Sequence, residues 1–426
     1  MNRSLKMNRI TQAWNRFRGN KDAKTLAGNF MWLSLLQVAG YVFPLITLPY
    51  LARVIGVDGF GKIAFAMAVM VWIQIIVDWG FNQTATRDVA QHRENKQRVS
   101  EIYSNVQWTR LFLVLCSLLI LLILICFIPK FRQEYDVLLV TFLAVPGHVL
   151  FPDWFFQAME KMKYISLLNM LMKLVFTIAI FVFIKQAEDY ILQPLFIALG
   201  YVMCGIIALY YIHWKWGIKL YAPRFDKILE ALRGSFDVFI NNIAPNFYNS
   251  FSVLLLGFWG GQSANGIYEG GNKFYVVTNN FLQTLVRAFY PFLARRPEKH
   301  NLFVVIAMGA TTACAAVLFI FAPWIVRVML SEEFVRSIFV IRCLAVSLVF
   351  VILYNCYGAC YLIIHNRTKI LRQVTTLVSL IGFLIAWPLV YYYTYIGAAL
   401  SVLISRALLG ILTCCVAKSG KLTLFR

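Results

Sequence analysis

Residues 41–87 read YVFPLITLPYLARVIGVDGFGKIAFAMAVMVWIQIIVDWGFNQTATR, and this stretch decides the fold class of the chain. An apolar segment ends near residue 55, a glycine-rich turn covers Gly56–Gly61, and a second apolar segment begins at Phe60. Because lipid admits only helices or closed barrels, two such segments predict a helical hairpin that crosses a membrane twice. Glycine suits the turn since the backbone must reverse tightly at the membrane surface.

The composition of the whole chain agrees with this interpretation. Of 426 residues, 60% are hydrophobic and 14% are charged, whereas a soluble domain carries about 25% charged residues. Apolar runs of roughly 20 residues recur, each long enough to span a bilayer, and the short alternating segments of a β-barrel are not the pattern. We therefore predict an all-α polytopic membrane protein with twelve transmembrane helices. The spans are expected near 28–52, 60–85, 104–128, 136–157, 164–184, 190–212, 235–258, 266–292, 302–324, 337–362, 371–392 and 395–416.

The positive charges indicate the orientation of these spans. The net charge is +21, and the basic residues gather in the tail before residue 27 and in the loop near 213–234. That loop holds Lys215, Lys219, Arg224, Lys227 and Arg233. By the positive-inside rule, both termini and this loop are expected to be cytoplasmic. Since the basic residues are spread over loops rather than gathered in one domain, we expect no nucleic-acid partner.

The central basic loop divides the predicted spans into six and six. The expected organisation is a basic cytoplasmic tail (1–27), an N-lobe (28–213), a basic cytoplasmic linker (214–234), a C-lobe (235–417) and a cytoplasmic tail (418–426). An even number of spans in each half gives both halves the same orientation. The lobes would then be related by a pseudo-twofold axis along the membrane normal, with a central cavity between them.

Four stretches together resemble one family of membrane transporters. They read PLITLPYLARVIGVDGFG (44–61), DWGFNQTATRDVAQHRENKQ (78–97), FPDWFFQAMEKMK (151–163) and NGIYEGGNKFYVVTNNFLQTLVRAFYPFLAR (265–295). Their order and spacing are similar to those of the O-antigen flippases, which belong to the multidrug/oligosaccharidyl-lipid/polysaccharide exporter superfamily. The resemblance implies a multi-pass protein of the bacterial inner membrane, surrounded by membrane lipid. It would carry undecaprenyl-diphosphate-linked oligosaccharide repeat units from the cytoplasmic to the periplasmic leaflet by alternating access. An O-antigen polymerase and a chain-length regulator are conceivable protein partners.

Charged residues inside the predicted spans are the first candidates for a site. A charge at the bilayer centre costs at least about 3 kcal/mol, so such residues should face a cavity or a partner. The cations within spans are Arg110, Lys173, Lys273, Arg287, Arg342 and Arg406. We expect Lys173, Lys273, Arg287 and Arg406 to bind the diphosphate. Two alternatives stay open: Lys273 could simply pair with Glu269 four residues earlier, and Arg110 and Arg287 could extend to the membrane surface.

Amides and aromatic residues indicate a ligand of sugar size. Asn242, Asn246 and Asn249 share one face of the seventh predicted span, and Tyr268 follows in the eighth. The eighth span also contains Tyr275, Asn279, Asn280 and Gln283. The alternative is interhelical hydrogen bonding, which is common for Asn in membranes and worth about 1 kcal/mol per bond.

Carboxylates in or near the spans are candidates for gating or ion coupling. These are Asp78, Asp153, Asp237 and Glu269. We expect Asp78 to form a latch between the lobes at the cytoplasmic gate by pairing with Arg87 or Arg287. The alternative is that Asp78 carries a proton. For His148, which lies within the fourth predicted span, we expect a structural role.

Two other functions stay open at this point. An ion-coupled antiporter for drugs or cations, from the same superfamily, would favour an acidic cavity, whereas the in-span cations outnumber the anions by six to four. A membrane glycan enzyme would need a large periplasmic loop, and no such loop is apparent. The sequence has no GxxxxGK[ST] phosphate loop and no convincing metal-ligand spacing. We therefore expect no enzyme activity, no metal and no cofactor.

Overall fold

The computed structural model describes residues 40, 42–243, 246, 250–365 and 367–419. Within these residues the secondary structure is helical and contains no strand. The first part of the chain forms the helices and short helical turns Val42–Val54, α3 (Gly56–Asp78), α4 (Phe81–Gln91), α5 (Lys96–Phe127), α6 (Pro129–Gln133), α7 (Tyr135–Phe142), α8 (Ala144–Leu150), α9 (Asp153–Ala158), α10 (Met162–Phe183), η1 (Ala187–Ile191), α11 (Leu192–Tyr210), η2 (Tyr211–Lys215) and α12 (Phe225–Ile243). The second part forms α14 (Phe251–Trp259), α15 (Gly261–Arg295), η3 (Pro297–Lys299), α16 (His300–Met329), η4 (Glu332–Phe334), α17 (Ser337–Tyr354), η5 (Asn355–Ile363) and α18 (Thr368–Ser419).

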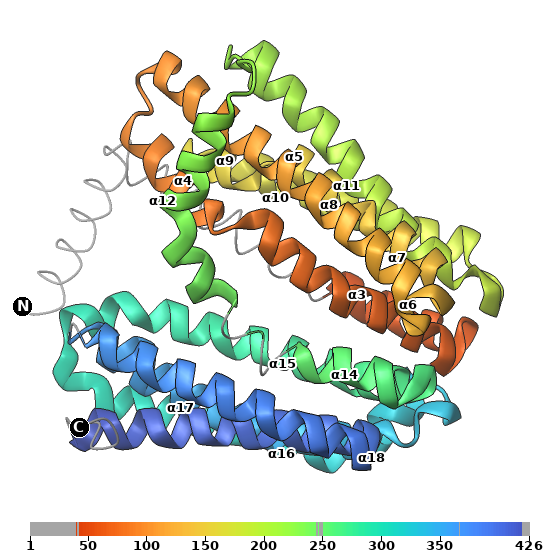
Figure 1. Cartoon of the computed structure of the whole chain (residues 1–426). Coiled ribbons are helices and arrows are strands. Elements are labelled where there is room, and N and C mark those ends of the chain that lie inside the picture. Colours follow the sequence, from red (N-terminus) through yellow and green to blue (C-terminus); the bar gives the residue numbers. More distant parts are fainter. Residues whose placement is uncertain (1–39, 41, 244–245, 247–249, 366, 420–426) are drawn as a thin grey trace, which may run out of the picture.

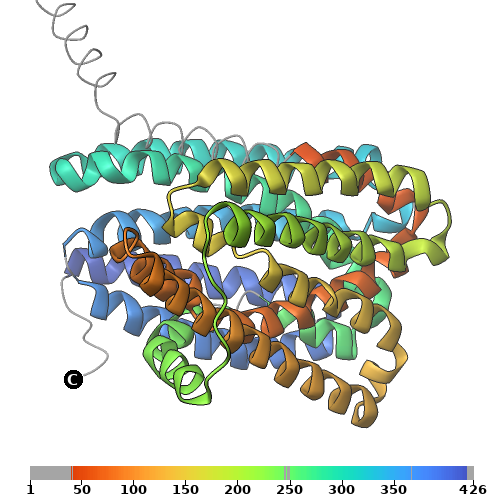
Figure 2. The same cartoon turned by 90° about the horizontal axis from the view of Figure 1, so that it is seen from above.

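Figure 1 shows these helices gathered into two groups. The N-terminal group runs from the helix Val42–Val54 to α12, and the C-terminal group runs from α14 to α18. The groups approach each other where α3 and α15 begin, and they diverge toward the C-terminal end of α18. In the view turned by 90°, most helices of both groups still run along roughly one direction (Figure 2). Such a shared direction is expected of helices that cross a bilayer.

The hairpin sequence has its turn at the expected position. Gly56 has φ of 65°, in the left-handed region, and it separates the helix Val42–Val54 from α3. α3 in turn ends where Trp79 and Gly80 take φ of 43° and 82°. Because a left-handed residue breaks the helical hydrogen-bond ladder, α4 starts as a separate helix from Phe81.

Eight segments in the described part of the chain are long and apolar enough to cross a membrane. One of them, α18, covers both the eleventh and the twelfth predicted spans, and Thr394 interrupts it with φ of 48° and ψ of −124°. Most of the first predicted span and the middle of the seventh lie outside the described residues. The eighth coincides with α15, which is rich in polar side chains and is not among the eight. The chain is therefore a polytopic helical protein, and the count of twelve stays a prediction.

α12, which begins within the predicted basic linker, packs against the N-terminal group. The indole of Trp79 stacks on Phe239 with ring centroids 4.1 Å apart, and its Nε1 donates to the carbonyl of Leu232 at 2.9 Å. The hydroxyls of Thr84 and Ser235 lie 2.8 Å apart. α12 therefore extends the N-terminal group before the chain enters the C-terminal group at α14.

The two groups meet most closely where α3 crosses α15. A Cβ atom at Gly61 would overlap the carbonyl oxygen of Gln262, and one at Gly266 would overlap the carbonyl oxygen of Val57. Glycine allows this approach because it has no side chain to keep the backbones apart. Phe60 packs edge-on against Phe334 in the same region, with ring centroids 5.7 Å apart. We call this region the closed end.

Hydrogen bonds join the two groups at the closed end. The backbone N–H of Val57 donates to Glu333 at 2.9 Å, and Arg53 Nη2 donates to the carbonyl of Val328 at 2.8 Å. Further bonds run from Gln262 Nε2 to Glu134 Oε1 at 2.5 Å and from the Ser263 hydroxyl to Asp58. Polar contacts therefore complete a junction at whose centre Gly61 and Gly266 each lie against a backbone carbonyl of the other helix.

Candidate functional site

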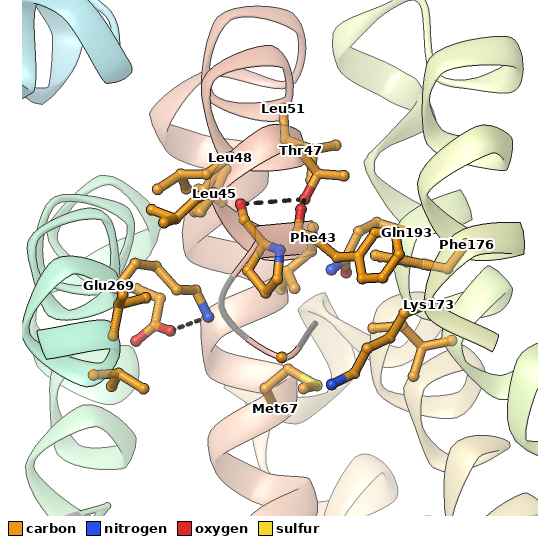
Figure 3. A pocket seen from close by; sticks show the side chains of 18 of the residues that line it. Phe43, Leu45, Thr47, Leu48, Leu51, Met67, Lys173, Phe176, Gln193 and Glu269 are labelled. Atoms are coloured by element: carbon orange, nitrogen blue, oxygen red, sulfur yellow. Dashed lines mark hydrogen bonds and ion pairs between the residues drawn. The ribbon is translucent and has the colours of Figure 1, made fainter. Parts of the chain in front are cut away.

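A cleft of about 410 Å³ lies between the two groups of helices. Its walls come from the helix Val42–Val54, α3, α10, α11 and α15. Most of the lining is apolar, including Phe43, Leu48, Met67, Phe176 and Val277. Figure 3 shows these walls, with the charged side chains reaching in from opposite sides. We call this cavity the apolar cleft.

Two lysines and one carboxylate face the apolar cleft. Lys273 Nζ lies 2.6 Å from Glu269 Oε1, one helical turn away on α15. Lys173 enters from α10 on the opposite wall and is half-buried (Figure 3). The pairing of Lys273 with Glu269, left open in the sequence, is therefore observed. With two cations and one anion, these lining side chains carry a net positive charge.

A second cavity of about 430 Å³ lies within the C-terminal group. Amides, tyrosines and one arginine dominate its lining, and we call it the polar pocket. The lining consists of Ser250, Tyr268, Asn272, Tyr275, Val276, Asn279, Asn280, Gln283, Val351, Tyr354, Asn355, Arg406 and Leu409. Val276 and Asn280 also line the apolar cleft, so α15 stands between the two cavities.

Arg406 is held in place inside the polar pocket. Its side chain is 8% exposed, its Nη1 donates to the Ser347 hydroxyl at 3.0 Å, and its guanidinium lies 4.1 Å from the ring centroid of Tyr275. Tyr268 is 2% exposed nearby. Arg406 and Tyr268 therefore share a cavity, whereas Lys173 and Lys273 belong to the apolar cleft.

Three other predicted binding residues, Arg287, Asn242 and Asn246, lie outside the two cavities. Arg287 is exposed on α15. Asn242, at the end of α12, accepts a weak hydrogen bond of 3.5 Å from Gln83. Asn246 donates to the backbone of Asn242 at 3.0 Å and accepts from Ser250. Asn249 lies outside the described residues. The structure therefore does not bring Arg287, Asn242 and Asn246 together with the lysines.

Asp78 belongs to a buried cluster in the N-terminal group. Arg110 Nη2, on α5, donates to Asp78 Oδ1 at 2.5 Å, with the two side chains 0% and 20% exposed. Gln74 Nε2 donates to the same carboxylate oxygen at 3.0 Å. His148 Nδ1, on α8, lies 3.0 Å from Gln74 Nε2 and 3.2 Å from Arg110 Nη2. Since both neighbours are donors, His148 Nδ1 is the acceptor, which makes the ring neutral.

The expected partner of Asp78 was wrong. Neither Arg87 nor Arg287 contacts it; Arg87 is exposed and pairs at 2.8 Å with the adjacent Asp88. Arg110, for which extension to the membrane surface was left open as an alternative, is fully buried. The geometry of the helices explains the choice of partner. Asp78 is the last residue of α3 and faces α5, whereas Arg87 lies on α4 beyond the break at Gly80. Since all partners of Asp78 belong to the N-terminal group, the observed pair does not join the two groups.

The two remaining candidate carboxylates, Asp153 and Asp237, lie on different helices. Asp153 begins α9 and accepts a hydrogen bond at 2.8 Å from the backbone of Trp154. Asp237 is exposed on α12. Neither of them lines the apolar cleft or the polar pocket.

The sequence interpretation missed several lining residues. Gln193 in the cleft and Ser250, Asn272, Tyr354 and Asn355 in the polar pocket were not candidates. The signal was present for Asn355, because an amide within the tenth predicted span is itself a candidate for a cavity. No group of three or more potential metal ligands occurs in the part of the chain that the structure describes.

Comparison with known proteins assigns the chain to a family. A family model described as "Polysaccharide biosynthesis protein" matches residues 26–296, more than half of the chain. The chain belongs to this family. A relative from Escherichia coli (strain K12), named "Putative O-antigen transporter", is 25% identical over 411 residues, covering 95% of this chain and 99% of its own. A relative of the same name from Shigella dysenteriae is 24% identical, covering 89% and 97%. These names confirm the resemblance seen in the sequence, and the family member is a multi-pass membrane transporter rather than an enzyme.

Solved structures confirm the polytopic helical fold class. The lipid II flippase MurJ, in an inward closed conformation, superposes with a TM-score of 0.74 at 13% identity, covering 92% of this chain and 87% of its own. A mutant form of the MATE transporter VcmN of Vibrio cholerae gives a TM-score of 0.56 at 14% identity, covering 93% and 96%. At such identities the likeness concerns the arrangement of helices alone.

Proposed function

We propose that this family member is a flippase for undecaprenyl-diphosphate-linked O-antigen oligosaccharide. It would move the repeat unit from the cytoplasmic to the periplasmic leaflet of the bacterial inner membrane by alternating access. The observation that carries the proposal is the apolar cleft between the two groups, with Lys173 and Lys273 on opposite walls. An apolar wall suits a prenyl chain, and lysine is a common ligand for phosphate. The names of the full-length relatives support the same class of cargo.

The proposal includes the membrane arrangement. Twelve spans would form two six-span lobes related by a pseudo-twofold axis, with the lobe and linker boundaries given above and both termini in the cytoplasm. The two helix groups would then open toward the cytoplasm, because they diverge toward the C-terminal end of α18. In that state a lipid-linked sugar could enter the apolar cleft from the cytoplasmic leaflet. An O-antigen polymerase and a chain-length regulator would take the product on the other side.

Surface display of O-antigen in a strain that lacks the native gene tests the proposal. Lys173→Ala and the double variant Lys273→Ala/Glu269→Gln remove the cleft cations; the second change avoids leaving Glu269 unpaired. Each lost charge-assisted contact weakens binding by about 1.5–3 kcal/mol, so surface glycan should fall. Arg132→Ala is the control, because Arg132 is exposed and hydrogen-bonds to the carbonyl of Cys126. Equal surface glycan in all three, at matched protein levels, would refute diphosphate binding by the lysines.

An antiporter for organic cations, the alternative left open by the sequence, is the second candidate, and MATE transporters share the arrangement of helices. The charges of the apolar cleft count against it, since its lining has two lysines and one carboxylate. A cation would be repelled by such a site. Resistance to cationic drugs, measured with and without expression in the same strain, separates the two. Resistance without any change in surface glycan would favour the antiporter.

A further inference from the structure

The polar pocket differs from the apolar cleft in the chemistry of its walls. Among its thirteen lining residues, three are aliphatic and none is a carboxylate. Five carry a side-chain amide: Asn272, Asn279, Asn280, Gln283 and Asn355. A prenyl chain would be excluded by so many polar groups, because each would lose its hydrogen bonds to water without replacement. An organic cation would find no carboxylate in the lining.

Sugar hydroxyls match these walls. A hydroxyl both donates and accepts, and an amide side chain offers two donors and an acceptor, so the two can bond in either direction. Tyr275 and Tyr354 add aromatic surface at the wall of the same cavity. The volume of about 430 Å³ falls within the range of about 300–1,000 Å³ that small-molecule sites occupy.

One acceptor of the polar pocket has no partner in the described structure. The side-chain oxygen of Asn279 is buried and unbonded. Native proteins seldom leave a buried acceptor in this state, and an exception calls for an explanation such as water or a ligand. Asn279 lines the pocket, so a hydroxyl placed there would satisfy it. Asn355 lines the same pocket, and its Nδ2 donates to the carbonyl of Val351 at 2.9 Å, which fixes the orientation of its amide.

The backbone around Asn355 supports a binding role independently. α17 ends at Tyr354, and the chain continues as the π-helix η5 (Asn355–Ile363). A π-helix is energetically poorer than an α-helix and occurs frequently at functional sites. Here it begins at the residue that lines the polar pocket.

We propose that the polar pocket is the subsite for the first sugars of the cargo, while the apolar cleft holds the prenyl diphosphate. This inference rests on the proposed flippase function. Val276 and Asn280, which line both cavities, are exposed on α15. A lipid-linked sugar can therefore lie across α15, with its diphosphate near Lys273 and its sugar beyond Asn280. Sugar specificity then resides in the C-terminal group and is separate from lipid binding.

The test compares two probes on the purified full-length protein in lipid nanodiscs. One probe is undecaprenyl diphosphate without sugar, and the other is the lipid-linked oligosaccharide extracted from the cells that make this protein. Native mass spectrometry measures both affinities. The variants are Asn279→Leu and Asn355→Leu in the polar pocket, and Lys173→Ala in the apolar cleft.

We expect each asparagine variant to lose about tenfold in affinity for the oligosaccharide probe, equivalent to about 1.4 kcal/mol. Its affinity for undecaprenyl diphosphate should stay within twofold, which also shows that the variant is folded. Lys173→Ala should lower the affinity for both probes. An equal loss for both probes in the asparagine variants, or no loss for either, would overturn the sugar subsite and leave the flippase intact. Failure of the unmodified protein to bind either probe would overturn the flippase function and the subsite together.

Discussion

The ion pair between Asp78 and Arg110 allows a sharp test of how charge is accommodated in the N-terminal group. Asp78→Asn leaves the guanidinium of Arg110, which is 0% exposed, without an anion. Breaking a buried pair in this way costs about 3–5 kcal/mol of unfolding free energy. Arg110→Met leaves Asp78 instead, and its side chain is 20% exposed. Since water can partly solvate that carboxylate, we expect a smaller loss of about 1.5–3 kcal/mol, the value of a hydrogen bond to a charged group.

The double variant Asp78→Asn/Arg110→Met decides whether the pair itself is responsible. It removes both charges, so its cost should be less than the sum of the single costs by about 1–3 kcal/mol. The matched control is Arg87→Met, because Arg87 and Asp88 form a pair whose side chains are 64% and 41% exposed. Such an exposed pair contributes about 0–1 kcal/mol.

The assay is equilibrium unfolding of the purified protein in mixed detergent micelles, followed by the fluorescence of its 11 tryptophans. Additive costs in the double variant, or an Asp78→Asn cost no larger than that of Arg87→Met, would refute the buried-pair reasoning. Surface O-antigen measured on the same variants then separates structure from transport. A stable double variant without surface glycan would favour the proton-carrying role of Asp78, and one with normal surface glycan would assign the pair to stability.

Three further outcomes follow from particular sites. Gly61→Ala should weaken the closed end, because its Cβ would overlap a backbone carbonyl of α15. Gly309→Ala is the control and should be neutral, because Gly309 has open space around it. Increased labelling of a cysteine introduced at the closed end would report the difference. A cysteine at Arg224 should not react with an impermeant reagent in intact cells, and labelling from outside would contradict the proposed topology. The hydrogen bond from Arg93 lowers the pKa of Glu160 in the folded protein. The pair should therefore stabilise the fold at pH values above the unfolded-state pKa of this carboxyl. This stabilisation should be lost as the pH falls through the lowered, folded-state pKa. Because both side chains are partly exposed, a melting curve against pH should differ only slightly between the native chain and Glu160→Gln.

The fold class was predictable from the sequence because the bilayer requires an apolar run of roughly 20 residues in every span. Long apolar runs with a glycine between them predicted the hairpin around Gly56. The break at Thr394 was less visible, since threonine is not a residue that marks a position of positive φ in a sequence. The packing of α12 on the N-terminal group was also invisible, because it depends on Trp79 and Phe239, which are 160 residues apart.

Pairings between charged residues of the candidate sites were predictable only where the interaction is local. Glu269 and Lys273 are one turn apart on a helix, and their spacing alone indicated the pair that the structure contains. The pair of Asp78 with Arg110 requires the mutual placement of α3 and α5, which spacing along the chain cannot supply. The division between an apolar cleft and a polar pocket depends in the same way on which face of α15 each side chain occupies.

The position of the closed end bears on how a transport cycle could be controlled. The groups are joined there by the contacts of Val57 with Glu333 and Arg53 with Val328, and by the close approach of the α3 and α15 backbones at Gly61 and Gly266. Asn265, also on α15, is 1% exposed, and neither atom of its amide has a partner in the described structure. If alternating access operates as proposed, these contacts must break when this end opens. Each hydrogen bond has a net value of about 0.5–1.5 kcal/mol, and exposure of the Asn265 amide to water would offset part of their loss. The contacts that hold the two groups together therefore join the helix Val42–Val54 and α3 to α15, α16 and η4, at the opposite end of α3 from the Asp78 latch that we expected.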